Sequence, residues 1–546
     1  MKPAVNVQVE LESGALREIS VARDDLLLAD ILAAHGMPLN TRCGQRGLCR
    51  GCEVLLRDGA MMIDGKVVVA PATVQSCRAR INEPVAIQIP GRSCVGHLPQ
   101  AGETFEIAVP YAHQPLFPAV AGGRDTGFAV DAGTTTVVLL LVDLVTGQVL
   151  SQAGAFNEQI RFGDNVITRI EAARKPEDLA AMQRAIVAET IQPLLLLACQ
   201  RAGRPLERIA GGAVAGNTTM LHLLIGEDPA PLGILPFTPR FLKGRQVLAR
   251  DLDLAAAGLA PETPVQLLPG IAAYIGADIA AGISATGMAF ARSPSLLVDI
   301  GTNGEMVLQS GGKLTACSTA AGPAFEGCGL CCGTRARAGA VGGLRLSLHP
   351  FQLEIETIGH VPLTRANGLC GSAYVDFLAT GRSSGLLGAT GRFETAAWES
   401  VPVQNRLMDN GGKALRLTDT CGAGALRVRE ADVALLLQAK AAIGAGIEIL
   451  LKTAGVRAVD VARVNLAGGF GMHLNVAHAI AIGLLPGFRE EQVRVVGNTS
   501  LAGALLALVD RTMLDEMENL RAQVKVIELN LADGFENAYI EHLMLA

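Results

Sequence analysis

The chain has 546 residues, of which 50% are hydrophobic and 18% charged, which is enough for several domains with substantial cores. Its 46 Lys and Arg against 52 Asp and Glu give a net charge of −6, so there is no basic surplus for a polyphosphate backbone and we expect no nucleic-acid partner. The 62 Gly and the 4% aromatic content indicate a tightly packed α/β protein.

The N-terminus alternates apolar and polar residues and lacks the basic head and apolar run of a signal peptide, so we expect none. No stretch approaches 18 uninterrupted apolar residues, which predicts no membrane span. Together these features predict a cytoplasmic protein. Twelve cysteines in such a chain point to metal or cofactor ligation rather than to disulfides, because the cytosol keeps thiols reduced.

Residues 1–92 predict a small β-grasp-like domain, because short alternating strands are broken by turn residues and one helix lies around Leu26 to His35. The expected strands are VNVQVEL, EISVA, EVLLRDG, KVVVAP and VAIQIP. Residues 93–125 are rich in Pro and Gly and show no sustained periodicity, which is typical of a linker. Such a tether would let the first domain move.

From residue 126 onward, apolar strands alternate with Ala- and Leu-rich helices such as 176–201 and 432–454, which predicts an α/β fold. We divide this part into a middle domain, 126–206, and a main domain, 207–546. Two internal repeats suggest related halves that face one cleft. They pair FAVDAGTTTVVLLLVD with LLVDIGTNGEMVLQ, and GGAVAGNTTMLHLL with VRVVGNTSLAGALL.

Four N-terminal cysteines follow the spacing Cys-x5-Cys-x2-Cys-x24-Cys, which suits a [2Fe-2S] cluster with four thiolate ligands. The candidate ligands are Cys43, Cys49, Cys52 and Cys77. The glycines between the first three allow the backbone to wrap closely around the metal. A structural zinc site is the alternative, and Cys94 could replace Cys77. We prefer Cys77 because it precedes a polar turn and a strand, as the fourth ligand of a ferredoxin does.

The other cysteines receive no cofactor. A second Cys-x2-Cys could bind metal, but free cysteine is among the most buried residue types, and a core position is favoured. These residues are Cys328, Cys331 and Cys332. Isolated cysteines are interpreted as core thiols, namely Cys199, Cys317, Cys370 and Cys421.

Two hairpins carry an aspartate followed by a Gly/Thr turn whose N–H and hydroxyl groups can cradle phosphate oxygens. Asp131 and Asp299 are the candidate catalytic residues, placed to hold Mg²⁺ or to orient water on bound ATP. The two cradles comprise Gly133, Thr134, Thr135, Thr136, Gly301, Thr302, Asn303, Gly304 and Glu305. A third, glycine-rich turn would let adenosine approach the backbone, through Gly468, Gly469 and Gly471.

This set resembles the phosphate-1, phosphate-2 and adenosine motifs of the acetate kinase, sugar kinase, heat-shock chaperone and actin superfamily, whose actin-like, ribonuclease-H-like ATPase fold is a duplicated α/β domain. A [2Fe-2S] domain joined by a linker to such an ATPase resembles the reductive activators of corrinoid-dependent methyltransferases. The resemblance extends to NEQIRFGDNVITRI, AGNTTMLHLL, STAAGPAFEG, GLCGSAYVDFL and AKAAIGAGIEILL. It implies ATP-dependent, one-electron reduction of inactive cob(II)alamin to cob(I)alamin. The implied partners are a corrinoid protein, an upstream reductase that supplies electrons and a second copy of the chain.

Two other functions remain open at this point. One is a ferredoxin-type electron carrier whose nucleotide-binding domain is a non-hydrolysing docking scaffold, and the other is a small-molecule kinase with an accessory cluster. A polar stretch before a predicted helix either edges the cleft or partner surface or forms a solvated loop with a helix cap. It contains Asn157, Gln159, Arg161 and Asp164. No histidine is assigned a role, including His473 and His478.

Overall fold

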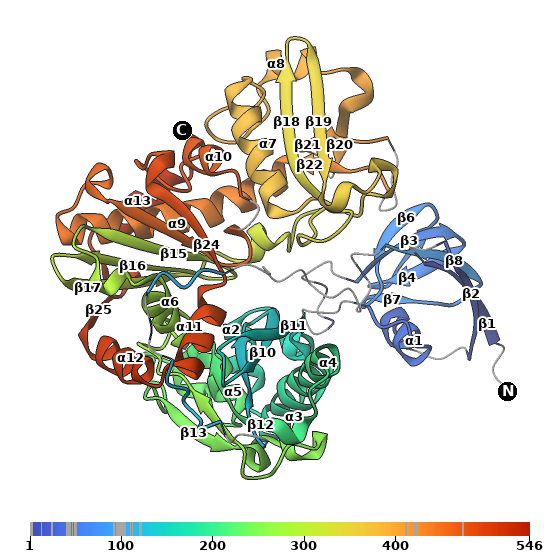
Figure 1. Cartoon of the computed structure of the whole chain (residues 1–546). Coiled ribbons are helices and arrows are strands. Elements are labelled where there is room, and N and C mark those ends of the chain that lie inside the picture. Colours follow the sequence, from blue (N-terminus) through green and yellow to red (C-terminus); the bar gives the residue numbers. More distant parts are fainter. Residues whose placement is uncertain are drawn as a thin grey trace. The chain divides into compact units, whose positions relative to one another are not determined.

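The computed structural model describes residues 4–11, 14–22, 26–39, 45, 47, 52–90, 93, 105–109, 111, 113–119, 123–409, 412–419, 424–471 and 474–546. They divide into two units, whose elements are labelled in Figure 1. One unit combines residues 1–97 with 323–436, and the other combines 98–322 with 437–546.

The N-terminal part of the first unit contains a five-stranded sheet in the order β2-β1-β8-β3-β6 and a three-stranded sheet in the order β5-β4-β7. Its elements are β1 (Ala4–Leu11), β2 (Leu16–Ala22), α1 (Leu28–Ala34), β3 (Glu53–Asp58), β4 (Ala60–Ile63), β5 (Lys66–Val69), β6 (Ala72–Gln75), β7 (Ala79–Arg80) and β8 (Val85–Ile89). β1 pairs antiparallel with β2 and parallel with β8. Helix α1 buries Leu28 and Leu32 in the core that contains Val7 and Ile87. This arrangement fits the predicted small ferredoxin-like domain.

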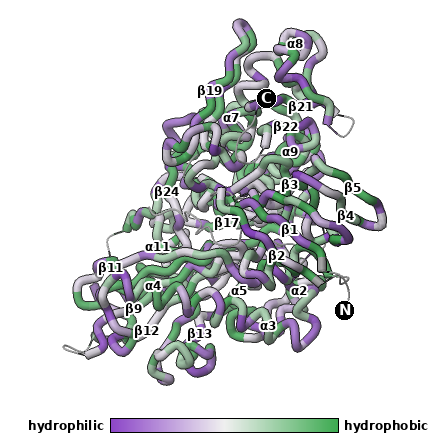
Figure 2. Tube along the Cα trace, turned by 90° about the vertical axis from the view of Figure 1, so that its right-hand side faces the viewer, coloured by the Kyte–Doolittle hydropathy of each residue, from purple (hydrophilic) through white to green (hydrophobic). Residues whose placement is uncertain are grey.

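The β4–β5 hairpin of this domain exposes apolar side chains. Val67 and Val69 are 64% and 65% exposed, and the hydropathy colouring shows the hairpin's green strands (Figure 2). The pattern of the strands elsewhere in the domain is the ordinary one, since β8 alternates buried and half-buried residues along its length.

Residues 323–436 of the first unit form a β-hairpin, a helix packed against it and a small three-stranded sheet. The elements are β18 (Val341–Leu348), β19 (Phe351–Thr357), α7 (Gly371–Ser383), α8 (Thr395–Ser400), β20 (Arg406–Asp409), β21 (Gly412–Arg416) and β22 (Arg427–Arg429). Phe377, Phe393 and Trp398 pack their rings together, with centroids 6.5 Å and 4.6 Å apart in the two successive pairs.

The second unit contains two six-stranded sheets. The first has the order β11-β10-β9-β12-β14-β13, and the second has the order β24-β23-β15-β16-β17-β25. The first sheet and its helices comprise β9 (Thr126–Ala132), β10 (Thr136–Asp143), β11 (Val149–Phe156), α2 (Val166–Ala172), α3 (Pro176–Ile186), α4 (Gln192–Ala202), β12 (Ile209–Ala215), α5 (Thr218–Leu224), β13 (Arg245–Leu248), β14 (Pro264–Leu267) and α6 (Ala277–Thr286).

The second sheet and its helices comprise β15 (Ser295–Ile300), β16 (Gly304–Ser310), β17 (Lys313–Thr319), α9 (Glu430–Ala454), β23 (Arg463–Ala467), α10 (Val476–Ala481), β24 (Val493–Gly497), α11 (Thr499–Val509), α12 (Thr512–Gln523), β25 (Val524–Ile527) and α13 (Phe535–His542). The two predicted long helices are present. The stretch 176–201 is interrupted by a π-helical segment, Val187–Ile191, and the other long helix is α9.

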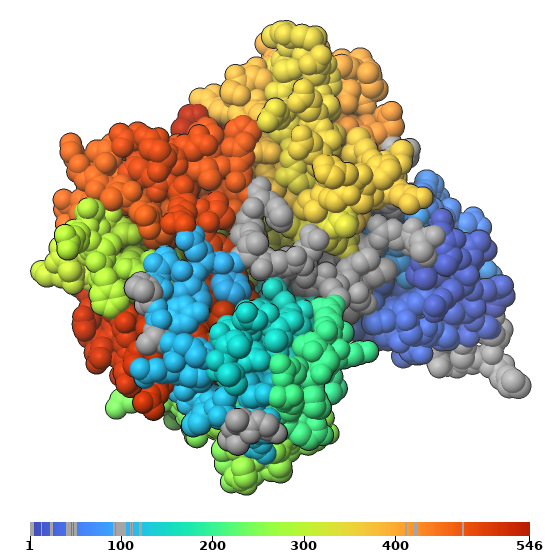
Figure 3. All heavy atoms as spheres, viewed as in Figure 1, coloured from blue at the N-terminus to red at the C-terminus, as the bar shows by residue number. Residues whose placement is uncertain are grey.

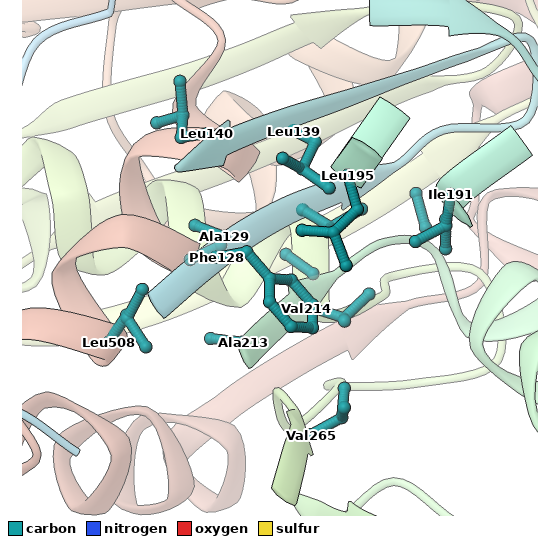
Figure 4. Packing of buried hydrophobic residues seen from close by; sticks show 14 of the residues in the cluster. Phe128, Ala129, Leu139, Leu140, Ile191, Leu195, Ala213, Val214, Val265 and Leu508 are labelled. Carbon is teal, nitrogen blue, oxygen red and sulfur yellow. The ribbon is translucent and has the colours of Figure 1, made fainter. Parts of the chain in front are cut away.

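The first sheet of this unit is buried on both faces. β9 is apolar on consecutive residues rather than alternate ones, because helices cover both sides of the sheet. Figure 4 shows Phe128 between Val214 of the neighbouring strand and Leu195 of α4, with Leu508 of α11 nearby. The first Asp-x-Gly-Thr hairpin therefore begins from a buried strand.

The predicted repeats correspond to repeated structure. β9 and β10 form one antiparallel hairpin, and β15 and β16 form the equivalent hairpin in the second sheet. In the other repeat, β12 leads into α5 and β24 leads into α11. Each helix is capped by an asparagine, because Asn217 accepts from the backbone N–H of Met220 and Asn498 accepts from that of Leu501. The predicted duplicated α/β architecture is thus confirmed.

Helices α6 and α11 pack against each other with very little space between their backbones. A Cβ added at Gly503 of α11 would lie 2.5 Å from the Cα of Ala281 in α6. α11 contains no charged side chain, is buried along its whole length and also contacts β9 and β12. A helix that follows the second sheet therefore packs on the first.

The predicted linker is packed where the structure describes it. The backbone N–H of Ala108 donates to the carbonyl of Ala285, and that of Leu116 donates to the carbonyl of Leu508, at 2.8 Å each. Figure 3 shows this light-blue segment lying on the surface of the second unit. The described residues between 105 and 119 therefore belong to the folded second unit and do not form a loose tether.

Among the described residues, one helix is long and apolar enough to cross a bilayer by length and composition alone. This helix is α9, and 78% of its most apolar stretch is buried inside the protein. Burial of this kind is typical of a core helix.

Candidate functional site

The first phosphate hairpin is held from behind by buried polar side chains. Asn157 donates through Nδ2 to the carbonyl of Gly133 at 3.0 Å, and its backbone N–H donates to the carbonyl of Thr135. Arg169 donates to the carbonyl of Thr134. Three successive carbonyls of the turn are thus fixed, which fixes the peptide planes between them.

Arg169 is the centre of this support. It is fully buried and also donates to the carbonyl of Gly163 and to Oε1 of Gln159, at 3.0 Å and 3.1 Å. Burial lowers the pKa of its guanidinium to about 9. Asn157 and Gln159 of the polar stretch are buried under the hairpin, so the stretch is not a solvated loop at these two positions. Asn157 also caps the short helix Glu158–Phe162, in which it accepts from the backbone N–H of Gln159. Arg161 lies outside this network and pairs with Glu189.

The second hairpin lies against the glycine-rich turn that follows β23. The backbone N–H of Gly301 donates to the carbonyl of Asn303 at 2.9 Å and closes the turn. Gly468 follows β23 with φ +92°, and a Cβ there would lie 2.7 Å from Oδ1 of Asp299. Only glycine fits this position, because a side chain would displace the carboxylate. The second phosphate hairpin and the predicted adenosine turn are thus adjacent.

Of the other predicted adenosine residues, Gly469 faces open space, since a Cβ there would meet nothing within 4 Å. Gly471 is nearer the core, with a Cβ position 3.2 Å from Leu466. The open backbone at Gly469 leaves room for a ligand beside β23.

Asp131 is held by the start of α11. Asn498 donates through Nδ2 to one carboxylate oxygen at 2.8 Å, and Ser500 donates through Oγ to the other at 2.7 Å. Burial raises the pKa of Asp131, and these two hydrogen bonds oppose that effect. The carboxylate is therefore oriented by neutral groups that leave its charge uncompensated.

Four carboxylates influence one another at this point of the molecule. Burial and then the charge of Asp131 raise the pKa of Asp299 to about 7. Burial, Asp299 and Asp131 raise the pKa of Asp278, in the first turn of α6, also to about 7. Burial, Asp278 and Asp299 raise the pKa of Glu305 well above its ordinary value. No basic side chain contributes to these shifts, so the cluster carries uncompensated negative charge. Within the described residues, no three of these side chains lie close enough together to hold a metal ion by themselves.

This cluster predicts that the ligand-free protein is more stable at lower pH. Because the pKa of Asp299 is about 7 in the folded protein and 3.8 in an ordinary aspartate, the folded state binds more protons than the unfolded state between these values. The free energy of unfolding therefore falls as pH rises through this window. Asp299→Asn removes the contribution, so its Tm relative to wild type should rise between about pH 4 and about pH 7 and level off above that. Calorimetry without Mg²⁺ or nucleotide measures this, and a pH-independent Tm difference would contradict it.

The predicted cluster ligands are described only in part. Cys52 and Cys77 are 0% and 2% exposed and belong to the same core cluster of the N-terminal domain. Gln75, two residues before Cys77, donates to the carbonyl of Gly47 at 3.0 Å and so links the two cysteine-bearing segments. Cys43, Cys49 and Cys94 lie outside the described residues.

Two family models match consecutive parts of the chain. The model described as the RACo middle region matches residues 126–291, and the model described as the C-terminal domain of RACo, the ASKHA domain, matches residues 293–546. The chain belongs to the RACo family. ASKHA denotes the acetate kinase, sugar kinase, heat-shock and actin fold, so the predicted fold class is confirmed.

Several named proteins align with most of this RACo family chain. The corrinoid activation enzyme RamQ of Eubacterium limosum is 28% identical over 96% of this chain and 97% of its own. The [Co(II) methylated amine-specific corrinoid protein] reductase of Methanosarcina barkeri is 26% identical over 76% of each chain. A solved structure of a reductive activator for corrinoid, iron-sulfur protein has a TM-score of 0.73 at 28% identity and covers 99% of this chain and 98% of its own.

Within this RACo family chain, the described cysteines of residues 323–436 are buried in a different environment. Cys331 and Cys332 have their sulfur atoms 3.7 Å apart, and the backbone N–H of Cys331 donates to Asp432 at 2.9 Å. The part of the chain that the structure describes contains no group of three or more metal-binding side chains arranged for a metal ion. Cys199, Cys317 and Cys370 are also buried, while Cys421 and His473 lie outside the described residues.

Sequence reasoning missed Asp278, Asn498, Ser500 and Arg169 in this RACo family site. The repeat that pairs GNTT with GNTS contained a signal for Asn498, since an asparagine between a strand and a helix is an expected cap. Asp278 and Arg169 carry no local signal of this kind. The packing of α6 brings Asp278 to the hairpins, and the packing of α2 brings Arg169 there.

The network predicts that Arg169→Lys weakens nucleotide binding in this RACo family chain. Lysine keeps a charge but loses the planar fork that reaches Thr134, Gly163 and Gln159 together. We expect affinity for Mg-ATP to fall about tenfold, the effect of roughly one lost charged hydrogen bond. Calorimetric titration of the full chain measures it. Arg174→Lys, an exposed change just after α2, is the control, and equal affinities for both variants would exclude the positioning role.

Proposed function

We propose that this chain is an ATP-dependent reductive activator that returns an inactive Co(II) corrinoid protein to Co(I) by a one-electron transfer. Membership of the RACo family and the names of the relatives support this function. The observation that carries the ATP-dependent part is the convergence of Asp131, Asp299, Asp278 and Glu305 beside two phosphate hairpins. An electron-transfer scaffold alone would need none of these carboxylates.

The N-terminal domain would hold a [2Fe-2S] cluster through Cys43, Cys49, Cys52 and Cys77. Burial of Cys52 and Cys77 in the domain core supports this set. A two-iron cluster supplies one electron at a time, so one electron leaves the reduced cluster and converts Co(II) to Co(I). An upstream reductase must then supply the next electron. The difference between the reduction potentials of the cluster and of the Co(II)/Co(I) couple decides how much free energy ATP would have to supply for the electron transfer.

The second unit would bind Mg-ATP. The N–H and hydroxyl groups of 133–136 and 301–304 would bind phosphate oxygens, and the turn at Gly468, Gly469 and Gly471 would accommodate adenosine. The carboxylates of Asp131 and Asp299 would hold Mg²⁺ or orient the attacking water. Asp278 and Glu305 extend the same negative cluster and would contact the ion through water. Mg²⁺ neutralises charge on the transferred phosphoryl group.

The remaining parts of the proposal concern partners and location. The partners are a corrinoid protein, an electron-donating reductase and a second copy of the chain in a homodimer. We place the protein in the cytoplasm because its described cysteines are buried thiols rather than disulfides.

An anaerobic experiment tests this function. The chemically reduced protein is mixed with a cob(II)alamin-loaded corrinoid protein, and the cobalt spectrum is followed with Mg-ATP, with a non-hydrolysable analogue and without nucleotide. We expect Co(I) to form only with hydrolysable ATP, with ADP and phosphate released.

Two results would contradict the proposal. Equal Co(I) formation with the analogue would favour the electron carrier with a non-hydrolysing scaffold. Absence of Co(I) with several corrinoid proteins, although the iron-sulfur spectrum is present, would remove the corrinoid as substrate.

A further inference from the structure

A cavity of about 680 Å³ lies beside the second phosphate hairpin, within the second unit. This volume is in the range of small-molecule sites. Asn303 of the hairpin forms part of its wall, together with the end of β17 and the β25–α13 segment. The remaining wall comes from the part of the second unit that carries its first sheet. In the second sheet β17 and β25 lie on the opposite side of the hairpin from β23, which carries the adenosine turn. The cavity is therefore separate from the proposed adenosine site.

Four aromatic rings line this cavity. Phe237 and Tyr274 meet edge to face with centroids 5.5 Å apart, and Phe535 and Tyr539 of α13 have centroids 6.4 Å apart. Phe237 has φ +56°, a left-handed conformation that a bulky side chain rarely adopts. Such strain persists only where the surrounding structure imposes it, and it is concentrated at functional sites.

The cavity's charges are all of one sign. Its ionisable acids are Glu528 and Glu536, and its lining contains no Lys, Arg or His. Glu528 is close enough to Tyr274 that its charge, after burial, contributes to raising the pKa of the phenol. The phenol of Tyr274 donates to the carbonyl of Leu232 at 2.6 Å. Its proton is therefore engaged within the protein, and the hydrogen bond holds the ring in place. The chain from residue 526 to its last residue likewise contains no Lys or Arg.

We propose that this cavity is a ligand site for a small organic cation, of the quaternary or methylated ammonium class. Aromatic faces attract such cations through their quadrupoles, and carboxylates add Coulomb attraction without the hydrogen-bond geometry that a primary amine would demand. The apolar walls formed by Ile275 and Leu529 suit the cation's methyl groups.

Calorimetric titration of the full chain tests the site with choline as the probe, without nucleotide or corrinoid protein. The matched control ligand is 3,3-dimethylbutan-1-ol, which has the shape of choline and no charge. We expect choline to bind at one site per chain and at least about tenfold more tightly than the neutral alcohol. The result is independent of the proposed corrinoid function, because neither reaction partner is present.

Variants then locate the site. Glu528→Gln and Tyr539→Leu are each expected to weaken choline binding about tenfold. Glu541→Gln removes a carboxylate from the same helix as Tyr539 but not from the cavity lining, so it should bind choline as wild type does. Circular dichroism establishes that each variant is folded.

Three results would overturn the proposal. Equal affinity for choline and the neutral alcohol would mean that the cavity recognises only shape. Equal weakening by Glu541→Gln would indicate a general surface-charge effect. Absence of saturable binding by wild type would exclude the site.

Discussion

Replacing Asp299 by Asn is expected to reduce ATP-dependent Co(I) formation by about 100-fold or more while the iron-sulfur spectrum stays unchanged. The carboxylate lies against Gly468 and interacts with Asp131, so it sits where the hairpins and the adenosine turn meet. Asparagine keeps its size but cannot supply negative charge to Mg²⁺. The measurement is the rate of cobalt reduction in the anaerobic assay, with the cluster's absorption recorded on the same sample.

Asp460→Asn is the control for this variant, because Asp460 forms an exposed pair with Arg457 away from the acidic cluster. It should keep the wild-type rate. An unchanged rate in Asp299→Asn would exclude the proposed role of that carboxylate. A loss of the cluster spectrum together with activity would instead indicate misfolding.

Replacing Cys52 or Cys77 by Ser is expected to abolish the iron-sulfur absorption and electron transfer and to leave Mg-ATP binding within about twofold of wild type. Both thiols are in the core of the N-terminal domain, whereas the nucleotide residues belong to the second unit. Absorption and electron paramagnetic resonance spectra measure the cluster, and calorimetry measures nucleotide affinity.

Cys199→Ala provides the control, since Cys199 is buried in α4 of the second unit. It should retain a full cluster signal. A full signal in Cys77→Ser would exclude Cys77 as a ligand and favour Cys94, the alternative that the spacing leaves open.

Local patterns were sufficient to predict the hairpins, and tertiary contacts were required for the rest of the site. Asp131 and Asp299 end apolar strands and precede Gly/Thr turns, so their neighbours along the chain reveal them. Asp278 lies in a helix within an Ala- and Gly-rich segment, and only the packing of α6 brings it to Asp299. Arg169 is similar, because nothing in the sequence of α2 shows that its guanidinium is buried against Thr134.

Domain grouping is the other matter that local patterns do not determine. No change of composition or periodicity in the sequence marks residues 323–436 as a separate part. These residues nevertheless group with 1–97, while the segments on either side form the second unit. β12 and β14 also continue the sheet of β9 beyond residue 206. The proposed boundaries at 92, 125 and 206 remain predictions.

The contact between α6 and α11 has a mechanical consequence for the second unit. At Gly503 and Ala281 the two helices meet almost backbone to backbone, and the start of α11 touches α6 at Gly282. Interlocked backbones resist sliding, so we infer that the two sheets move relative to each other by rotation about this crossing. Asp278 and the partners of Asp131 lie at the beginnings of these same helices. A rotation about this crossing would therefore leave the spacing of these side chains nearly unchanged while parts of the two sheets farther from it move more.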